Sequence, residues 1–101
     1  MTQELIQHII DNDLGQKWEN YGHKRVYLNW LDIIGFKITY YNTGNISSAR
    51  HDGEKVSNTR AREIVRGKAY IDLMTNELVT RNFISKYKEI LVTTLDNMEL
   101  S

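Results

Sequence analysis

The chain of 101 residues contains no cysteine and no proline. The lack of cysteine excludes disulfide bonds, zinc–thiolate sites and thiol nucleophiles within this chain. Because there is no proline and no run rich in glycine and serine, nothing marks a linker between two units. We therefore expect one domain over residues 1–101, with a single hydrophobic core that needs no metal or disulfide to hold it.

Long hydrophobic runs and an excess of charge of one sign are also missing. No apolar stretch approaches the ~20 residues of a membrane-spanning helix, and the first fifteen residues lack the pattern of a signal peptide, so we expect no membrane partner and a cytoplasmic location. Lys and Arg number 13, and Asp and Glu also number 13. This balance argues against a sequence-indifferent nucleic-acid coat, which normally carries a strongly basic domain.

Sequence motifs of catalysis and cofactor binding are absent as well. The six glycines are isolated and form neither a dinucleotide-binding nor a phosphate-binding loop. His8, His23 and His51 have no metal-ligand spacing and adjoin no carboxylate in a hydrolase motif. We predict a non-catalytic protein without metal or cofactor. Acid–base cleavage by His23, His51 and an arginine stays open as an alternative, since two histidines and a cation suffice for it.

Hydrophobic periodicity predicts an α+β fold. Thr2 is expected to cap a first helix that Gly15 ends as a left-handed residue, and residues 16–24 have the character of a connection. We expect a mostly antiparallel sheet with an N-terminal helix, a short middle helix and a C-terminal helix packed on it. The strands are expected over 25–30, 36–41, 46–50, 54–56, 69–73 and 78–81, with a loop over 42–45 and Asp52-Gly53 as a hairpin turn. The later helices are expected over 57–67, with Ser57 as its cap and Arg60 beside Glu63 as a pair, and over 84–98.

The middle of the chain is its basic part. Residues 44–70 hold six Lys and Arg against three acids, a net charge of +3. On the expected middle helix, Arg62 and Arg66 are four residues apart and fall together opposite the apolar side. Guanidinium groups one turn apart match successive phosphates, or a row of carboxylates on a partner. The alternative is a solvated outer face, which any surface helix shows.

Aromatic residues are plentiful, with six tyrosines and two tryptophans. Tyr27 and Tyr41 alternate with apolar neighbours in their strands, so both are expected to point away from the core. Outward tyrosines stack on single-stranded bases or anchor protein interfaces. The alternative is that a helix covers this face too. Trp18 and Trp30 are expected in the core or at its rim.

These patterns together predict a small non-catalytic macromolecule-binding protein. We expect an inhibitor, adaptor or regulator of the phage or mobile-element type, suggested by its small size and by the missing catalytic motifs, that occupies a partner protein's surface. One alternative is a nucleic-acid-binding module that uses the basic 50–68 segment and outward tyrosines. Another is a self-associating structural protein with the stripe from Ile84 to Met98 as its seam. The expected partner-binding residues are Arg62, Arg66, Lys55, Lys68, Arg50, Tyr27 and Tyr41.

Overall fold

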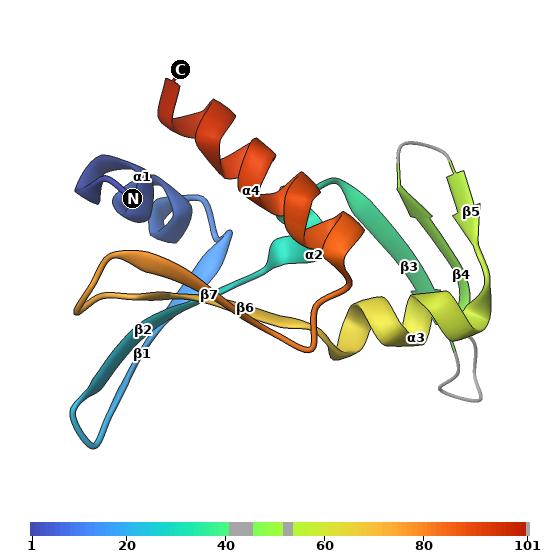
Figure 1. Ribbon diagram of the computed structural model, residues 1–101, viewed down its shortest axis with the longest axis horizontal. Coiled ribbons are helices and arrows are strands. Elements are labelled where there is room, and N and C mark those ends of the chain that lie inside the picture. The colour runs from blue at the N-terminus through green and yellow to red at the C-terminus, as the bar shows by residue number, and fades with distance from the viewer. Residues whose placement is uncertain (41–45, 52–53, 101) are drawn as a thin grey trace.

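The computed structural model describes the backbone of residues 1–40, 46–51 and 54–100, and the side chains of residues 1–36, 56–57 and 59–99 (Figure 1). Within these residues the α+β class and the antiparallel pairing predicted from the sequence are confirmed. The elements are α1 (Gln3–Asp11), β1 (Gly15–Asn20), β2 (His23–Leu28), α2 (Trp30–Ile33), β3 (Phe36–Tyr40), β4 (Ile46–His51), β5 (Glu54–Val56), α3 (Asn58–Arg66), β6 (Lys68–Asp72), β7 (Glu77–Arg81) and α4 (Ser85–Leu100).

The strands divide into two antiparallel sheets. One has four strands in the order β1-β2-β6-β7, and the other has three in the order β3-β4-β5. Because β2 pairs directly with β6, the three-stranded sheet and α3 form an insertion between these two strands. The indole Nε1 of Trp30 donates a hydrogen bond of 3.0 Å to the Gly67 carbonyl, which joins the two ends of this insertion.

One face of the four-stranded sheet, here called the inner face, lies beneath α1 and α4 (Figure 1). At its centre Val26 and Ile71 are cross-strand partners, and both side chains are 0% exposed. The apolar stripe predicted for the C-terminal helix therefore packs inside the chain. The buried residues of the two helices are Leu5, Ile6 and Ile9 of α1 and Tyr87, Leu91 and Leu95 of α4.

The first helix ends earlier than predicted. Its last residue is Asp11, the left-handed residue that follows is Asp13 with φ of 57°, and Gly15 begins β1. A Cβ at Gly15 would lie 2.9 Å from Cγ2 of Ile9 and 2.9 Å from Cγ1 of Val26. The prediction of Gly15 as the residue after the helix is wrong, because the close packing of α1 on the sheet is what requires a glycine there.

Residues 16–24 form most of a hairpin instead of the predicted connection. β1 and β2 pair from Gly15 with Leu28 to Asn20 with His23. The two residues between them, Tyr21 and Gly22, have φ of 47° and 83°. Two consecutive positive φ values are those of a type I′ turn, whose twist matches that of paired strands. The hairpin projects from the body of the molecule as an arm (Figure 1).

Several local predictions are confirmed. Ser57 caps α3 by accepting a hydrogen bond of 3.2 Å from the backbone N–H of Arg60, and Arg60 pairs with Glu63 at 3.4 Å. His51 and Glu54 are partners at the predicted hairpin, while the loop predicted over 42–45 lies outside the described residues. No helix of the described chain has the length and apolar character to span a membrane.

Candidate functional site

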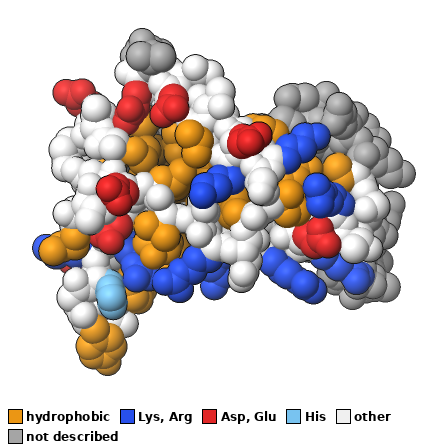
Figure 2. Space-filling view, viewed as in Figure 1, with side chains coloured by type: hydrophobic (Ala, Val, Ile, Leu, Met, Phe, Trp, Pro, Cys, Tyr) orange, Lys and Arg blue, Asp and Glu red, His pale blue; other side chains and the backbone are white. Residues whose placement is uncertain are grey.

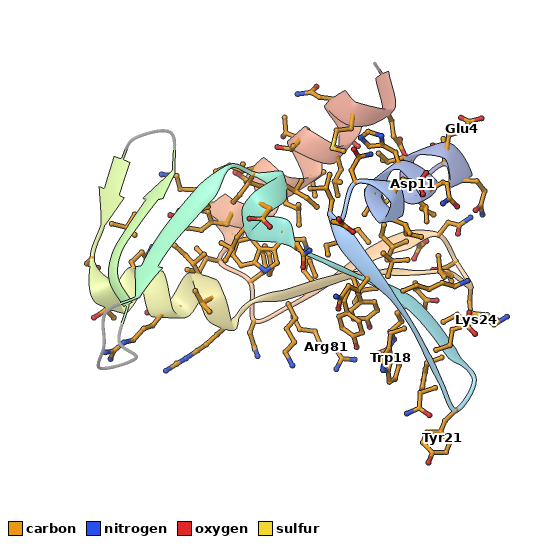
Figure 3. All side chains as sticks on the ribbon, turned by 180° about the vertical axis from the view of Figure 1, so that it is seen from behind. Glu4, Asp11, Trp18, Tyr21, Lys24 and Arg81 are labelled. Atoms are coloured by element: carbon orange, nitrogen blue, oxygen red, sulfur yellow. The ribbon has the colours of Figure 1, made fainter. Side chains whose placement is uncertain are left out.

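The side of the four-stranded sheet that faces away from α1 and α4, here called the outer face, carries both aromatic and charged side chains. Alternation along each strand and the cross-strand register assign its residues. No helix or strand of the described chain lies over it, and the labelled Trp18 and Arg81 project from this side in Figure 3. The outer-face positions are Gln16, Trp18, Asn20, His23, Arg25, Tyr27, Lys68, Tyr70, Asp72, Glu77, Val79 and Arg81.

Three rings and one guanidinium group form an aromatic cluster at the centre of this face: Trp18, Arg25, Tyr27 and Tyr70. The ring centroids of Trp18 and Tyr27 are 6.0 Å apart at 78°, an edge-to-face contact, and those of Tyr27 and Tyr70 are 5.4 Å apart. Such pairs add stability beyond the apolar area that they bury. Trp18 remains 39% exposed and Tyr27 half-buried, so the cluster is ordered and still reaches solvent.

Arg25 is held at the centre of the cluster by three contacts. Its Cζ lies 4.4 Å from the ring centroid of Tyr70 and 5.9 Å from that of Trp18, and its Nη1 donates a hydrogen bond of 3.2 Å to the Tyr27 hydroxyl. This hydrogen bond raises the pKa of Arg25, and electrostatic interactions with Tyr70, Tyr27 and Asp72 act in the same direction, against the lowering effect of desolvation. The guanidinium therefore stays charged and fixed in orientation.

A row of cations continues from the cluster along the edge of the molecule. Lys68 and Arg81 are cross-strand partners on the outer face, and Arg66 is exposed at the end of α3. Neither Arg66 nor Lys68 nor Arg81 forms an ion pair with a described residue. In Figure 2 the Lys and Arg side chains gather along the lower edge, beneath the sheet and α3. This side of the molecule is the more basic one.

A hollow opens where β2 leaves β6, next to the aromatic cluster. It has a volume of about 310 Å³, and two of its walls, Tyr27 and Lys68, belong to the outer face. Its lining residues are Tyr27, Leu28, Trp30, Gly67, Lys68 and Ala69.

The structure brings some of the residues predicted from the sequence together. Tyr27 points to the outer face as predicted, and Lys68 lies on the same face and in the same hollow. Arg62 and Arg66 are exposed on α3, beyond the end of the sheet. The three others, Arg50, Lys55 and Tyr41, have side chains outside the described residues.

Other members of the cluster were not predicted. Trp18 is exposed on the outer face and does not pack against the core, so its expected place in the core or at its rim is wrong, while Trp30 is buried as expected. Arg25 and Tyr70 were missed because their neighbours come from other strands. The one available signal was Tyr21-Gly22: a two-residue turn there sets a register in which Trp18 lies opposite Arg25.

The histidines considered for acid–base cleavage are not brought together. His23 begins β2, next to the tip of the β1–β2 arm, and His51 ends β4 of the other sheet. The arm and the three-stranded sheet lie at opposite ends of the molecule (Figure 1). Among the described residues, no group of three His, Asp or Glu side chains is placed to hold a metal ion.

Comparison with known proteins gives no relative. No family model matches the chain, and no curated protein and no solved structure matches it either. The function must therefore be argued from the outer face itself.

Proposed function

We propose that this protein is a non-catalytic binding protein, an inhibitor, adaptor or regulator, whose outer sheet face occupies the surface of a partner protein. The observation that carries the proposal is the exposed aromatic cluster with Arg25 fixed at its centre. Trp, Tyr and Arg dominate the binding energy of protein interfaces, and side chains already held in place lose little conformational entropy on binding.

The charges of the outer face support a protein partner over a nucleic acid. Beside the cations Arg25, Lys68 and Arg81, the same face carries the acids Asp72 and Glu77. A phosphate-binding surface normally carries one sign of charge, whereas protein interfaces combine an aromatic centre with a mixed polar rim. The zero net charge of the chain agrees with this interpretation.

The row of cations indicates which chemistry the partner presents. Arg66 and Lys68 have no ion pair among the described residues. Carboxylates on a partner can therefore pair with them without first breaking an ion pair to a described residue. The partner is therefore expected to offer an apolar or aromatic group to Trp18 and acids to the row beyond it.

Affinity capture with matched variants tests this proposal. We expect Trp18→Ala to lose the partner that the unchanged protein captures, because it removes the most exposed ring of the cluster. Met74→Ala is the control, since Met74 is a large exposed apolar residue at the β6–β7 turn, outside the outer face. A protein captured equally by both variants would contradict a role for the aromatic cluster.

A second variant separates charge from geometry. Arg25→Lys keeps the charge but loses the planar group that lies over Tyr70 and bonds Tyr27. We expect it to weaken capture strongly, with an unchanged circular dichroism spectrum. Full retention of the partner by this variant would mean that Arg25 contributes only its charge.

The second candidate function is binding of single-stranded nucleic acid. It is favoured by Arg66, Lys68 and Arg81, which form no ion pair with a described residue and lie next to an exposed ring. Anisotropy titrations with labelled single- and double-stranded DNA and RNA at two salt concentrations distinguish it. Neutralised phosphates make log affinity fall with log salt at about 0.7–0.9 per contact. Tight, salt-steep binding would replace the first proposal, and no binding would remove this one.

A further inference from the structure

The β6–β7 ladder places like charges opposite each other at both of its ends. Lys68 is the cross-strand partner of Arg81, and Asp72 is the partner of Glu77. Like charges in directly opposed positions destabilise a pair of strands. The acidic pair has Arg25 across from it on β2, but the cationic pair forms no ion pair with a described acid. Within one chain this arrangement of charges is unfavourable.

β7 is also an edge strand without the usual protection. In the described part of the chain its backbone bonds only to β6. Its inner-face residues are Leu78 and Thr80, and its central residue Val79 is apolar. The opposite edge, β1, instead carries Lys17 and Glu19 on the inner-face side, joined by an ion pair of 3.3 Å. Charged side chains in such positions discourage pairing with another strand. The β1 edge is therefore protected against pairing with a second chain, and the β7 edge is not.

We propose that β7 pairs antiparallel with β7 of a second copy of this chain, about a two-fold axis at Val79. In this register Glu77 faces Arg81 of the second copy and Arg81 faces its Glu77. Leu78 lies opposite Thr80, and the two Val79 side chains meet on the outer face. Both like-charge pairs then gain a neighbour of opposite sign, and the two sheets continue as one sheet of eight strands.

Of the aromatic cluster and the row of cations, the pairing uses Arg81 alone, and it does not rest on the partner protein proposed above. The axis is perpendicular to the sheet, so the outer faces of both copies lie on the same side of the dimer. Trp18 and Tyr27 belong to β1 and β2, away from the seam, and remain accessible. Because β7 has only five residues, the interface is small for a specific contact, and the dimer is expected to dissociate on dilution.

Sedimentation over a range of concentrations, with four samples, tests the register. The unchanged chain is expected to dimerise with a Kd below about 1 mM. Glu77→Arg alone and Arg81→Glu alone are each expected to raise this Kd at least tenfold. A 1:1 mixture of the two variants should recover it, because one copy then offers two cations along β7 and the other offers two anions. Native mass spectrometry should show this species as a heterodimer.

Loss of dimerisation through unfolding is excluded by the design of these variants. Each one turns an internal like-charge pair of the ladder into an opposite-charge pair, so the monomer is expected to melt no earlier than the unchanged protein. Lys17→Glu on β1 is the control and should leave dimerisation unchanged. A monomer at all concentrations would overturn the proposal, and so would single variants that dimerise fully or a mixture that fails to do so.

Discussion

The two faces of the four-stranded sheet are built from alternate residues of the same strands, yet they are ordered by different forces. On the inner face Val26 and Ile71 are 0% exposed beneath α1 and α4, and apolar burial holds them. On the outer face Trp18 is 39% exposed, and ring contacts and the guanidinium of Arg25 keep the cluster ordered. Stability is therefore expected to reside mainly on one face and binding on the other.

The largest effect is expected at the centre of the inner face. Ile71→Ala removes a fully buried side chain and leaves a cavity, so the free energy of unfolding should fall by about 2–5 kcal/mol. Urea denaturation followed by circular dichroism measures it. Val79→Ala, on the neighbouring strand but on the outer face, is the matched control. An equal fall in the free energy of unfolding for the two variants would contradict the expectation that stability resides mainly on the inner face.

The next effect is expected where α1 meets the inner face. Gly15→Ala places a Cβ 2.9 Å from side-chain carbons of Ile9 and Val26 and 3.0 Å from the Tyr27 carbonyl oxygen. We expect a loss of about 1–3 kcal/mol by overpacking, measured by thermal or urea unfolding. Gly22→Asn is the control, since no atom lies within 4 Å of its added Cβ and Asn tolerates positive φ. An unchanged Gly15→Ala variant would show that α1 packs less tightly than described.

A smaller loss of stability is expected on the outer face. Trp18→Ala removes one edge-to-face contact and part of the packing around Arg25, so the free energy of unfolding should fall by about 1 kcal/mol. In the same variant, capture of the protein partner should be abolished. A loss as large as that of Ile71→Ala would mean that the outer face contributes to the core, and its role in binding would then lose its main support.

The smallest effect is expected to have the opposite sign. Arg81→Glu replaces a cation opposite Lys68 with an anion, so the monomer should gain about 0.2–1 kcal/mol of stability. The gain should shrink as salt is added, since the pair is exposed to solvent. Thermal melts of dilute protein at low and high salt measure both parts. A destabilised variant would show that Arg81 contributes more through its contact with Tyr70 than it loses beside Lys68.

Local pattern was enough to predict much of this fold. The alternation of Val26, Tyr27 and Leu28 gave the direction of Tyr27, because strand period depends only on neighbours in sequence. Ser57 as a helix cap and the α+β class followed in the same way. The prediction was wrong for Gly15, because a glycine fits both the end of a helix and a position where two elements approach closely. Only the short distance to Ile9 shows that the second role applies.

The aromatic cluster depended on information that local pattern does not contain. Tyr27 meets Tyr70 because β2 pairs with β6 across the whole insertion, and Trp18 meets Arg25 because a two-residue turn sets the hairpin register. The prediction instead assigned the cations of residues 50–68 to one binding surface, because they lie close together in the sequence. Of these, Lys68 alone is described on the same face as Tyr27, since α3 carries Arg62 and Arg66 past the end of the sheet.

The two tryptophans give this molecule a separate optical reporter for each of its two properties. Trp30 is 6% exposed and its indole N–H is bound to the Gly67 carbonyl, so its emission is expected at short wavelength and should change only when the insertion separates from the sheet. Trp18 lies at the solvent boundary beside a guanidinium group, so its emission is expected at longer wavelength and open to quenchers in the solvent. Unfolding and surface occupation can thus be followed in one sample without any added label.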